Sequence, residues 1–167
     1  MDPAFHIVSG MVIAKALTGD HLVAGALMAN LPDLISVPFS YTVKFRLARK
    51  DRLTHFLSDF KRFEQSGIAV SPDLMRVYHG AHNLFFWAIV SISLLVALPP
   101  PLAITLSLCH LSHLLTDVHS HEKDYASRPL YPLFTSSISG GRNWTSNKLV
   151  FFGSWGLLLI IAFFVLL

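Results

Sequence analysis

The sequence predicts an all-α integral membrane protein built from helix hairpins, with a transmembrane helix at its C-terminus. Hydrophobic residues make up 53% of the 167 residues and charged residues only 14%, whereas a soluble domain carries about 25% charged residues. Long stretches without any charge alternate with proline- and glycine-containing breaks, which divide the chain into segments of helical length. This composition argues against a soluble globule and against a disordered chain.

Two short apolar segments open the chain and predict a first pair of helices. Residues 4–17 are apolar, Thr18-Gly19-Asp20 interrupts them, and residues 21–31 form a second segment that ends at Pro32. Each helix would be about 18 Å long, too short to cross a hydrocarbon core of about 30 Å. We therefore expect a buried or half-inserted hairpin. Small residues would let its helices pack closely: Gly10, Ala14 and Ala16 on the first, and Ala24, Gly25 and Ala29 on the second.

Many of the basic residues lie in segment 39–64, which is also rich in aromatic and aliphatic residues. Such an amphipathic, basic segment is typical of helices that lie on a membrane surface and of cytoplasmic loops. No nucleic-acid-binding motif accompanies it. We therefore expect membrane lipid, and not nucleic acid, as the partner of this segment.

Residues 78–118 predict a transmembrane hairpin. Residues 84–98 carry no charge, Pro99-Pro100-Pro101 forms a turn, and residues 102–118 make the returning arm. Counted from Tyr78, the first arm has about 21 residues, enough to span a membrane.

The last segment, residues 149–167, also carries no charge and predicts a C-terminal transmembrane helix. The polar residues 119–148 before it contain several Lys and Arg residues, so this loop and segment 39–64 are expected on the cytoplasmic side. The chain thus divides into a helical domain over residues 1–147 and a terminal membrane helix over 149–167.

Histidine is unusually frequent, with nine residues beside ten carboxylates. Most of these imidazoles, with two aspartates, lie near the open ends of the two expected hairpins, where the topology brings them to one membrane interface. Imidazole and carboxylate groups bind zinc, iron or manganese. We therefore predict a metal site with these candidate ligands: His6, Asp33, His79, His82, His110, His113 and Asp117.

The spacing within the second hairpin supports this site. His79 and His82 are three residues apart, and His113 and Asp117 are four apart, so each pair would share one face of a helix. The candidate ligands exceed four, so either one or two divalent ions, with zinc first among them, could bind.

The loop that follows the second hairpin supplies candidate catalytic groups. Long loops in compact proteins are often functional. Glu122 and Asp124 are the expected general bases, and His119 and His121 lie beside them.

Several motifs of the chain, taken in order, resemble those of the membrane-bound metal-dependent hydrolases, a family distantly similar to zinc-dependent phospholipase C. The resemblance lies in His6, Leu31-Pro32-Asp33, Ala81-His82-Asn83-Leu84, His110-Leu-Ser-His113-Leu-Leu-Thr-Asp117 and Arg128-Pro-Leu-Tyr-Pro-Leu133. It covers roughly residues 6–133. It implies a hydrolytic reaction and points to five of the candidate ligands: His6, Asp33, His82, His113 and Asp117.

These features predict a membrane-embedded metal-dependent hydrolase that cleaves a phosphoester or another ester, with lipids among the candidate substrates. We expect it in a bacterial-type inner membrane, with its site at the cytoplasmic interface. Two alternatives stay open. One is a membrane haem protein with His82 and either His113 or His110 as axial ligands. The other is a non-enzymatic membrane scaffold with a structural metal site.

Overall fold

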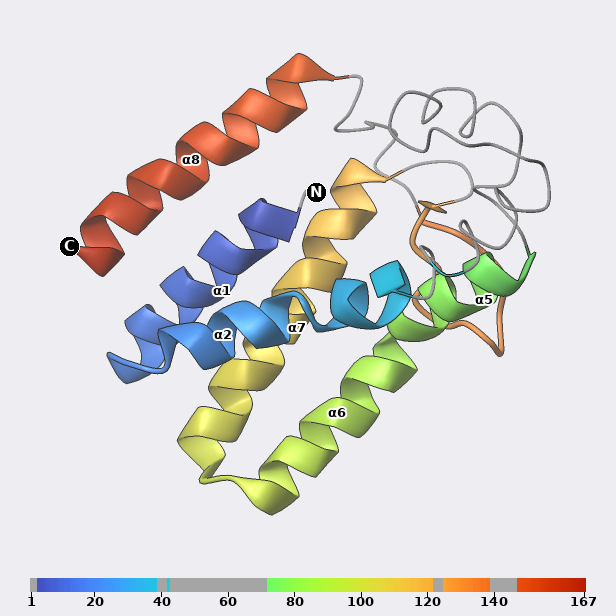
Figure 1. Cartoon of the computed structure of the whole chain (residues 1–167), viewed down its shortest axis with the longest axis horizontal. Coiled ribbons are helices and arrows are strands. Elements are labelled where there is room, and N and C mark those ends of the chain that lie inside the picture. Colours follow the sequence, from blue (N-terminus) through green and yellow to red (C-terminus); the bar gives the residue numbers. More distant parts are fainter. Residues whose placement is uncertain (1–2, 39–41, 43–71, 122–124, 139–146) are drawn as a thin grey trace.

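The computed structural model describes residues 3–38, 42, 72–121, 125–138 and 147–167. Within these residues every regular element is a helix (Figure 1), and the one strand-like pairing is a bridge between Ser127 and Ile138. The all-α class is therefore confirmed. The named helices are α1 (Pro3–Thr18), α2 (Leu22–Ala29), α5 (Pro72–Ala81), α6 (Leu84–Ala97), α7 (Pro100–Ser120) and α8 (Lys148–Leu166). Segment 39–64, apart from Thr42, lies outside the described residues.

Helices α1 and α2 are in close contact through their small residues. A Cβ atom on Gly10 would lie 2.3 Å from the carbonyl oxygen of Gly25, and one on Gly25 would lie 2.6 Å from Cβ of Ala14. Neither glycine can therefore carry a side chain without moving a backbone. The expected small-residue contact is confirmed for Gly10, Ala14, Gly25 and Ala29, whereas Ala16 is exposed and takes no part.

The second helix ends earlier than the sequence predicts. Helix α2 stops at Ala29, and residues 31–38 form a new helical segment. Pro32 lies in the first turn of this segment, where its missing N–H group costs no helical hydrogen bond. The new start places Asp33 within this short helix, beside the end of α2.

The expected first arm of the hairpin 78–118 is not one helix. Helices α5 and α6 meet at a break and are bent by 47°. The Asn83 side chain explains the break, because it accepts a hydrogen bond from the Phe86 amide at 2.8 Å and donates one to the His79 carbonyl at 2.7 Å. The same side chain thus caps the start of α6 and bonds to the end of α5.

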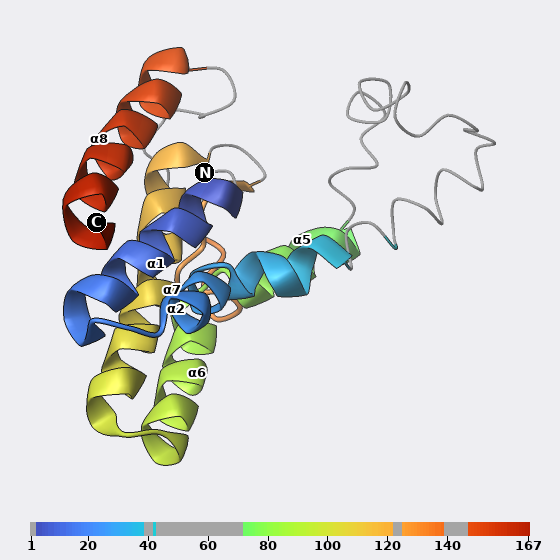
Figure 2. The ribbon, with the colours of Figure 1, turned by 60° about the vertical axis from the view of Figure 1, so that its left-hand side comes forward.

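Helix α7 lies at the centre of the bundle and contacts α1, α2 and α6 (Figures 1 and 2). The Trp87 indole on α6 donates to the carbonyl oxygen of Ser107 on α7 at 2.9 Å. Helix α8 packs on α1, where Phe5 and Val12 form a small core with Leu158 and Ala162. Helix α7 therefore contacts three other helices, whereas this small apolar core lies between α1 and α8.

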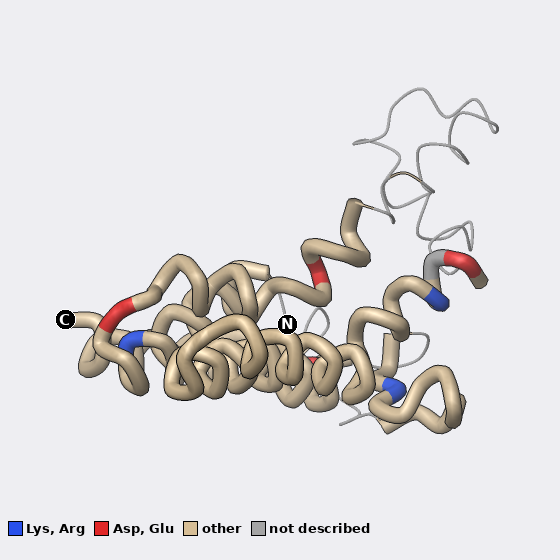
Figure 3. The backbone as a smooth tube through the Cα atoms, turned by 90° about the horizontal axis from the view of Figure 1, so that it is seen from below, with Lys and Arg blue, Asp and Glu red and all other residues tan. Residues whose placement is uncertain are grey.

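Helix α8 is long and apolar enough to cross a membrane, and the bent pair Met75–Ala81 and Leu84–Ala97 also qualifies if it counts as one span. Figure 3 shows how few charged residues the described helices carry. The charged side chains of α5, Asp73 and Arg76, are 76% and 72% exposed, whereas those of Asp33 and Asp117 are only 20% and 4% exposed. These two aspartates mark the part of the fold where charge has been brought into an apolar bundle.

Candidate metal centre

Histidine and aspartate side chains from separate elements meet beside the C-terminal half of α7. They form two overlapping groups, His6–Asp33–His113 and His82–His113–Asp117, and within each group the candidate ligand atoms all lie within 4.8 Å of one another. The groups unite the N-terminal helix, the segment after α2, the α5–α6 break and α7. The five residues in them are the five that the family resemblance implies.

Asp117 contacts three of the imidazoles in the cluster and is almost fully buried. Its Oδ1 lies 3.4 Å from Nε2 of His6, and its Oδ2 lies 3.2 Å from Nε2 of His113 and 3.8 Å from Nε2 of His82. Asp33 adds a second carboxylate, whose Oδ1 lies 3.4 Å from Nε2 of His82. Three imidazole Nε2 atoms therefore face two carboxylates.

Backbone carbonyls determine which ring nitrogen of His82 and His113 carries the proton. Nδ1 of His82 lies 2.9 Å from the Tyr78 carbonyl oxygen, and Nδ1 of His113 lies 2.7 Å from the Ala29 carbonyl oxygen. A carbonyl only accepts, so each Nδ1 must donate, and the neutral ring keeps its lone pair on Nε2. Neither Nε2 has a hydrogen-bond partner. This arrangement, with Nδ1 bonded to a carbonyl and Nε2 turned toward the other ligands, is the one found in metal-binding histidines.

His6 lies on the same centre and is fully buried. Its ring stacks on that of His113, with centroids 3.8 Å apart, and neither of its nitrogens makes a hydrogen bond. Burial lowers the pKa of His6 to about 4, although Asp117 acts in the opposite direction. His6 is therefore neutral at pH 7, as a metal-binding imidazole must be.

Asp33 supplies charge at the accessible edge of the centre. Burial by itself would raise the pKa of Asp33, but the His82 imidazole 3.4 Å away, and the positive charge that His113 and His82 carry when protonated, bring it below the usual value. Its side chain is 20% exposed, whereas those of the other four ligands are at most 4% exposed. Asp33 is thus an ionised candidate ligand on the solvent-accessible side of the cluster.

Comparisons of the chain with protein-family models, with curated proteins and with solved structures give no match. The resemblance to the membrane-bound metal-dependent hydrolases therefore stays a prediction that rests on the motifs quoted above.

Two further predicted ligands lie outside both groups. His110 is buried one turn before His113, where its ring contacts Phe86 edge-on. His79 is buried too, and its ring lies 5.3 Å from that of Tyr78 and 5.8 Å from that of Tyr131. The predicted general bases Glu122 and Asp124 lie outside the described residues.

Two contacts were not assigned from the sequence. Nδ1 of His121 lies 3.2 Å from Oδ1 of Asp117, and Tyr78 both bonds to His82 and stacks on its ring at 4.1 Å. Each residue stands four positions from its partner, a spacing that could have indicated the contact. His119, in contrast, is exposed and bonds to the Leu115 carbonyl of its own helix.

The donor set limits how metal can bind. Imidazole nitrogens with carboxylate oxygens suit zinc, iron or manganese. Nδ1 of His113 is committed to Ala29, so His113 can bind one ion only, through Nε2. The two groups therefore describe alternative ligand choices around one ion and not two independent three-ligand sites.

Proposed function

We propose that this chain is a membrane-embedded metal-dependent hydrolase that cleaves a phosphoester or another ester. The observation that carries the proposal is the set of three imidazole Nε2 atoms turned toward two carboxylates inside an apolar bundle. In the neutral rings these Nε2 atoms would offer lone pairs beside the carboxylate oxygens, and both kinds of group would serve as ligands of a bound divalent cation. Zinc is the ion we expect first. The proposed ligands are His6, Asp33, His82, His113 and Asp117.

The residues of the chain have distinct roles in this proposal. When bound, a divalent ion polarises an ester oxygen and lowers the pKa of water toward about 7. His82 and His113 offer Nε2 from rings whose orientation the backbone carbonyls fix. Asp117 offers charge from the buried side of the cluster, and Asp33 offers charge from its exposed edge. The net reaction adds one water molecule across a P–O or C–O bond, and a loop carboxylate such as Glu122 or Asp124 accepts the proton.

The membrane part of the proposal rests on apolar surface. Helix α8 and the α5–α6 pair have the length and composition of membrane spans. Large apolar side chains on these helices are widely exposed, among them Ile89, Val96 and Phe164, and such surface needs a lipid environment or a partner. We place the chain in a bacterial-type inner membrane, with the metal centre at the cytoplasmic interface.

Two other functions compete with this one. A haem would need its macrocycle between the rings of His82 and His113, but the Asp117 carboxylate lies within 3.8 Å of both Nε2 atoms, which argues against haem. A structural metal site in a non-enzymatic scaffold fits the deep burial of the other ligands, since structural zinc sites are closed. The partial exposure of Asp33 favours the hydrolase.

The test uses the full-length protein purified in detergent, with His82→Ala, Asp117→Asn and, as the matched control, His21→Ala at an exposed histidine outside the cluster. We expect about one zinc ion per chain in the wild type and in the control, and a loss of zinc in the other two variants. Hydrolysis of bis(p-nitrophenyl) phosphate or p-nitrophenyl acetate should follow the zinc content. Failure of the wild type to bind added zinc overturns the proposal. Stoichiometric zinc without hydrolysis of any ester supports the scaffold instead.

A further inference from the structure

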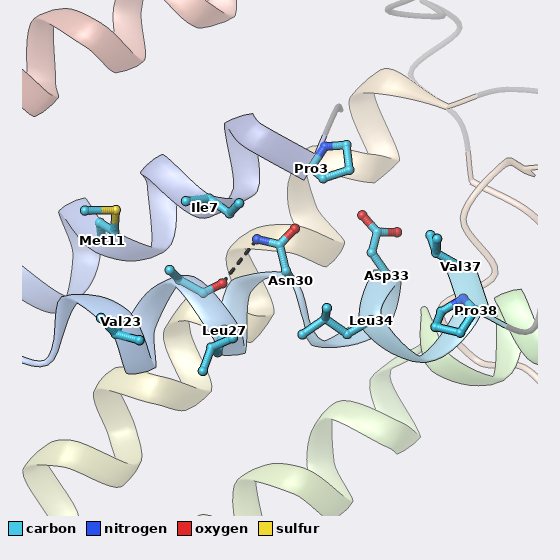
Figure 4. Close-up of a pocket in the computed structure, with 11 residues that line it drawn as sticks. Pro3, Ile7, Met11, Val23, Leu27, Asn30, Asp33, Leu34, Val37 and Pro38 are labelled. Carbon is cyan, nitrogen blue, oxygen red and sulfur yellow. Dashed lines mark hydrogen bonds between the residues drawn. The ribbon is translucent and has the colours of Figure 1, made fainter.

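An apolar groove of about 430 Å³ lies along α1, α2 and residues 31–38 (Figure 4). Ile7 and Met11 line it from α1, and Val23 and Leu27 line it from α2. In Figure 4, Met11 and Val23 lie at one end of the groove, and Asp33 lies toward the other. Its volume is in the range of ligand pockets, about 300–1,000 Å³.

The groove offers almost nothing to a polar ligand except at one point. Among the residues that line it, Asn30 and Asp33 have polar side chains. The Asn30 amide nitrogen already donates to the Ala26 carbonyl oxygen at 3.1 Å, the dashed line in Figure 4. Asp33 is the one charged side chain of the lining, so the chemistry of the groove changes from hydrocarbon to carboxylate at that residue.

That carboxylate is also part of the metal centre. Its Oδ1 lies 3.4 Å from Nε2 of His82, and it forms one of the two ligand groups with His6 and His113. It is the most exposed of the ligands. A molecule that lies in the groove therefore reaches the candidate metal centre at its Asp33 end, and an ester group at that end of the molecule would lie beside a bound ion.

We propose that the substrate is an amphipathic ester or phosphoester whose hydrocarbon chain lies in this groove, with its head group beside Asp33. This assignment rests on the proposed function. The chain would point from Asp33 toward Val23 and Met11. From Asn30 to Val23 the groove follows α2 for about two turns, roughly 11 Å, and Val23 and Leu27, which line it, are 74% and 54% exposed. Among the residues that line the groove, none at the Val23 end has a polar side chain for a head group.

A second cavity, of about 240 Å³, touches the centre at His82. The side chain of His82 is only 2% exposed, so this cavity offers less access to the ligand atoms than the groove does. Substitutions that change only the groove therefore show whether a ligand reaches the centre through the groove or through this second cavity.

The experiment measures binding of acetate, butyrate, hexanoate and octanoate to zinc-loaded full-length protein in detergent. The carboxylate stands for the head group, and the tail probes the groove. We expect the affinity to rise about fourfold for each added methylene. In Ala26→Phe, which fills the groove, this gain should disappear while acetate binding and zinc content stay unchanged. Ala97→Phe, at an exposed alanine of α6 outside the groove, is the matched control and should keep the gain. In Val23→Asp, at the far end of the groove, only octanoate should bind more weakly.

The outcomes separate the two proposals. Normal zinc uptake with equal affinity for all four carboxylates, or a gain that survives in Ala26→Phe, overturns the groove assignment alone. The same gain in zinc-free protein means that the groove holds surrounding lipid or detergent, and this too overturns the assignment. A protein that takes up no zinc overturns the proposed function and, with it, the inference that rests on it.

Discussion

Nδ1 of His113, on the central helix α7, lies 2.7 Å from the carbonyl oxygen of Ala29, the last residue of α2. The last carbonyls of a helix have no partner within that helix, so the imidazole satisfies one of them. The same bond fixes the rotation of the ring and leaves Nε2 for an ion. The end of α2 is therefore part of the metal centre although it contributes no ligand from its own residues.

Replacing His113 by alanine should abolish zinc binding. The substitution removes the one imidazole that belongs to both ligand groups, and the loss of affinity should exceed about 100-fold, the upper end for residues that merely support a ligand. Equilibrium dialysis followed by metal analysis measures the effect, with His21→Ala as the control. Retention of zinc by His113→Ala would show that the ion binds elsewhere.

His110→Leu should keep its zinc and fold at least as stably as the wild type. His110 is buried without a hydrogen bond to either ring nitrogen, and a buried polar group without a partner costs about 1–3 kcal/mol. We expect the free energy of unfolding to be unchanged or raised by about 1 kcal/mol. Thermal denaturation with parallel metal analysis tests both parts, and a loss of zinc would make His110 a ligand after all.

Gly10→Ala should destabilise the protein by about 1–3 kcal/mol, because overpacking forces a backbone to move. The added methyl group would lie 2.3 Å from the Gly25 carbonyl oxygen and 2.7 Å from the Ala29 side chain. Gly156→Ala on α8 is the matched control, since a Cβ atom there meets nothing within 4 Å. Comparison of the two melting temperatures measures the difference, and equal values would contradict the close contact of α1 and α2.

Asn83→Ala should weaken both the fold and the metal centre. The substitution removes the cap of α6 and the bond to the His79 carbonyl, at a cost of about 1–2 kcal/mol for the cap, and it frees the neighbouring His82. Asn147→Ala removes the comparable cap of α8, where the side chain accepts from Leu149 and Val150. Both variants should melt earlier, but zinc affinity should fall only in Asn83→Ala. An unchanged zinc affinity in Asn83→Ala would argue against a positioning role of the break.

The five residues of the two ligand groups were all among the candidates predicted from the sequence, whereas His79 and His110 lie outside both groups. His110 shares a helix with His113 and Asp117, yet it lies about 10 Å along the axis from Asp117, too far to share an ion with that carboxylate. His79 lies within α5, which ends at Ala81, so it does not share a regular helix with His82, and it belongs to neither ligand group.

The breaks in the helices were harder to predict than the helices themselves. The apolar segment after Tyr78 looks continuous when only hydropathy is considered, although Asn83 before an apolar segment is a recognisable N-cap signal. The bond between His113 and Ala29 is a contact between distant parts of the chain, which local spacing does not reveal. Tertiary contacts of this kind decide which candidate ligands share an ion.

The candidate ligands are also synthesised at different times, because a protein emerges from the ribosome with its N-terminus first. His6 and its helix are complete long before α7 exists. The pair α1 and α2 can close on its glycines early, but the pocket for the ion is finished only when α7 brings His113 and Asp117 against it. Metal binding would therefore require residues up to Asp117 to have been synthesised, and it would connect α1 to α7.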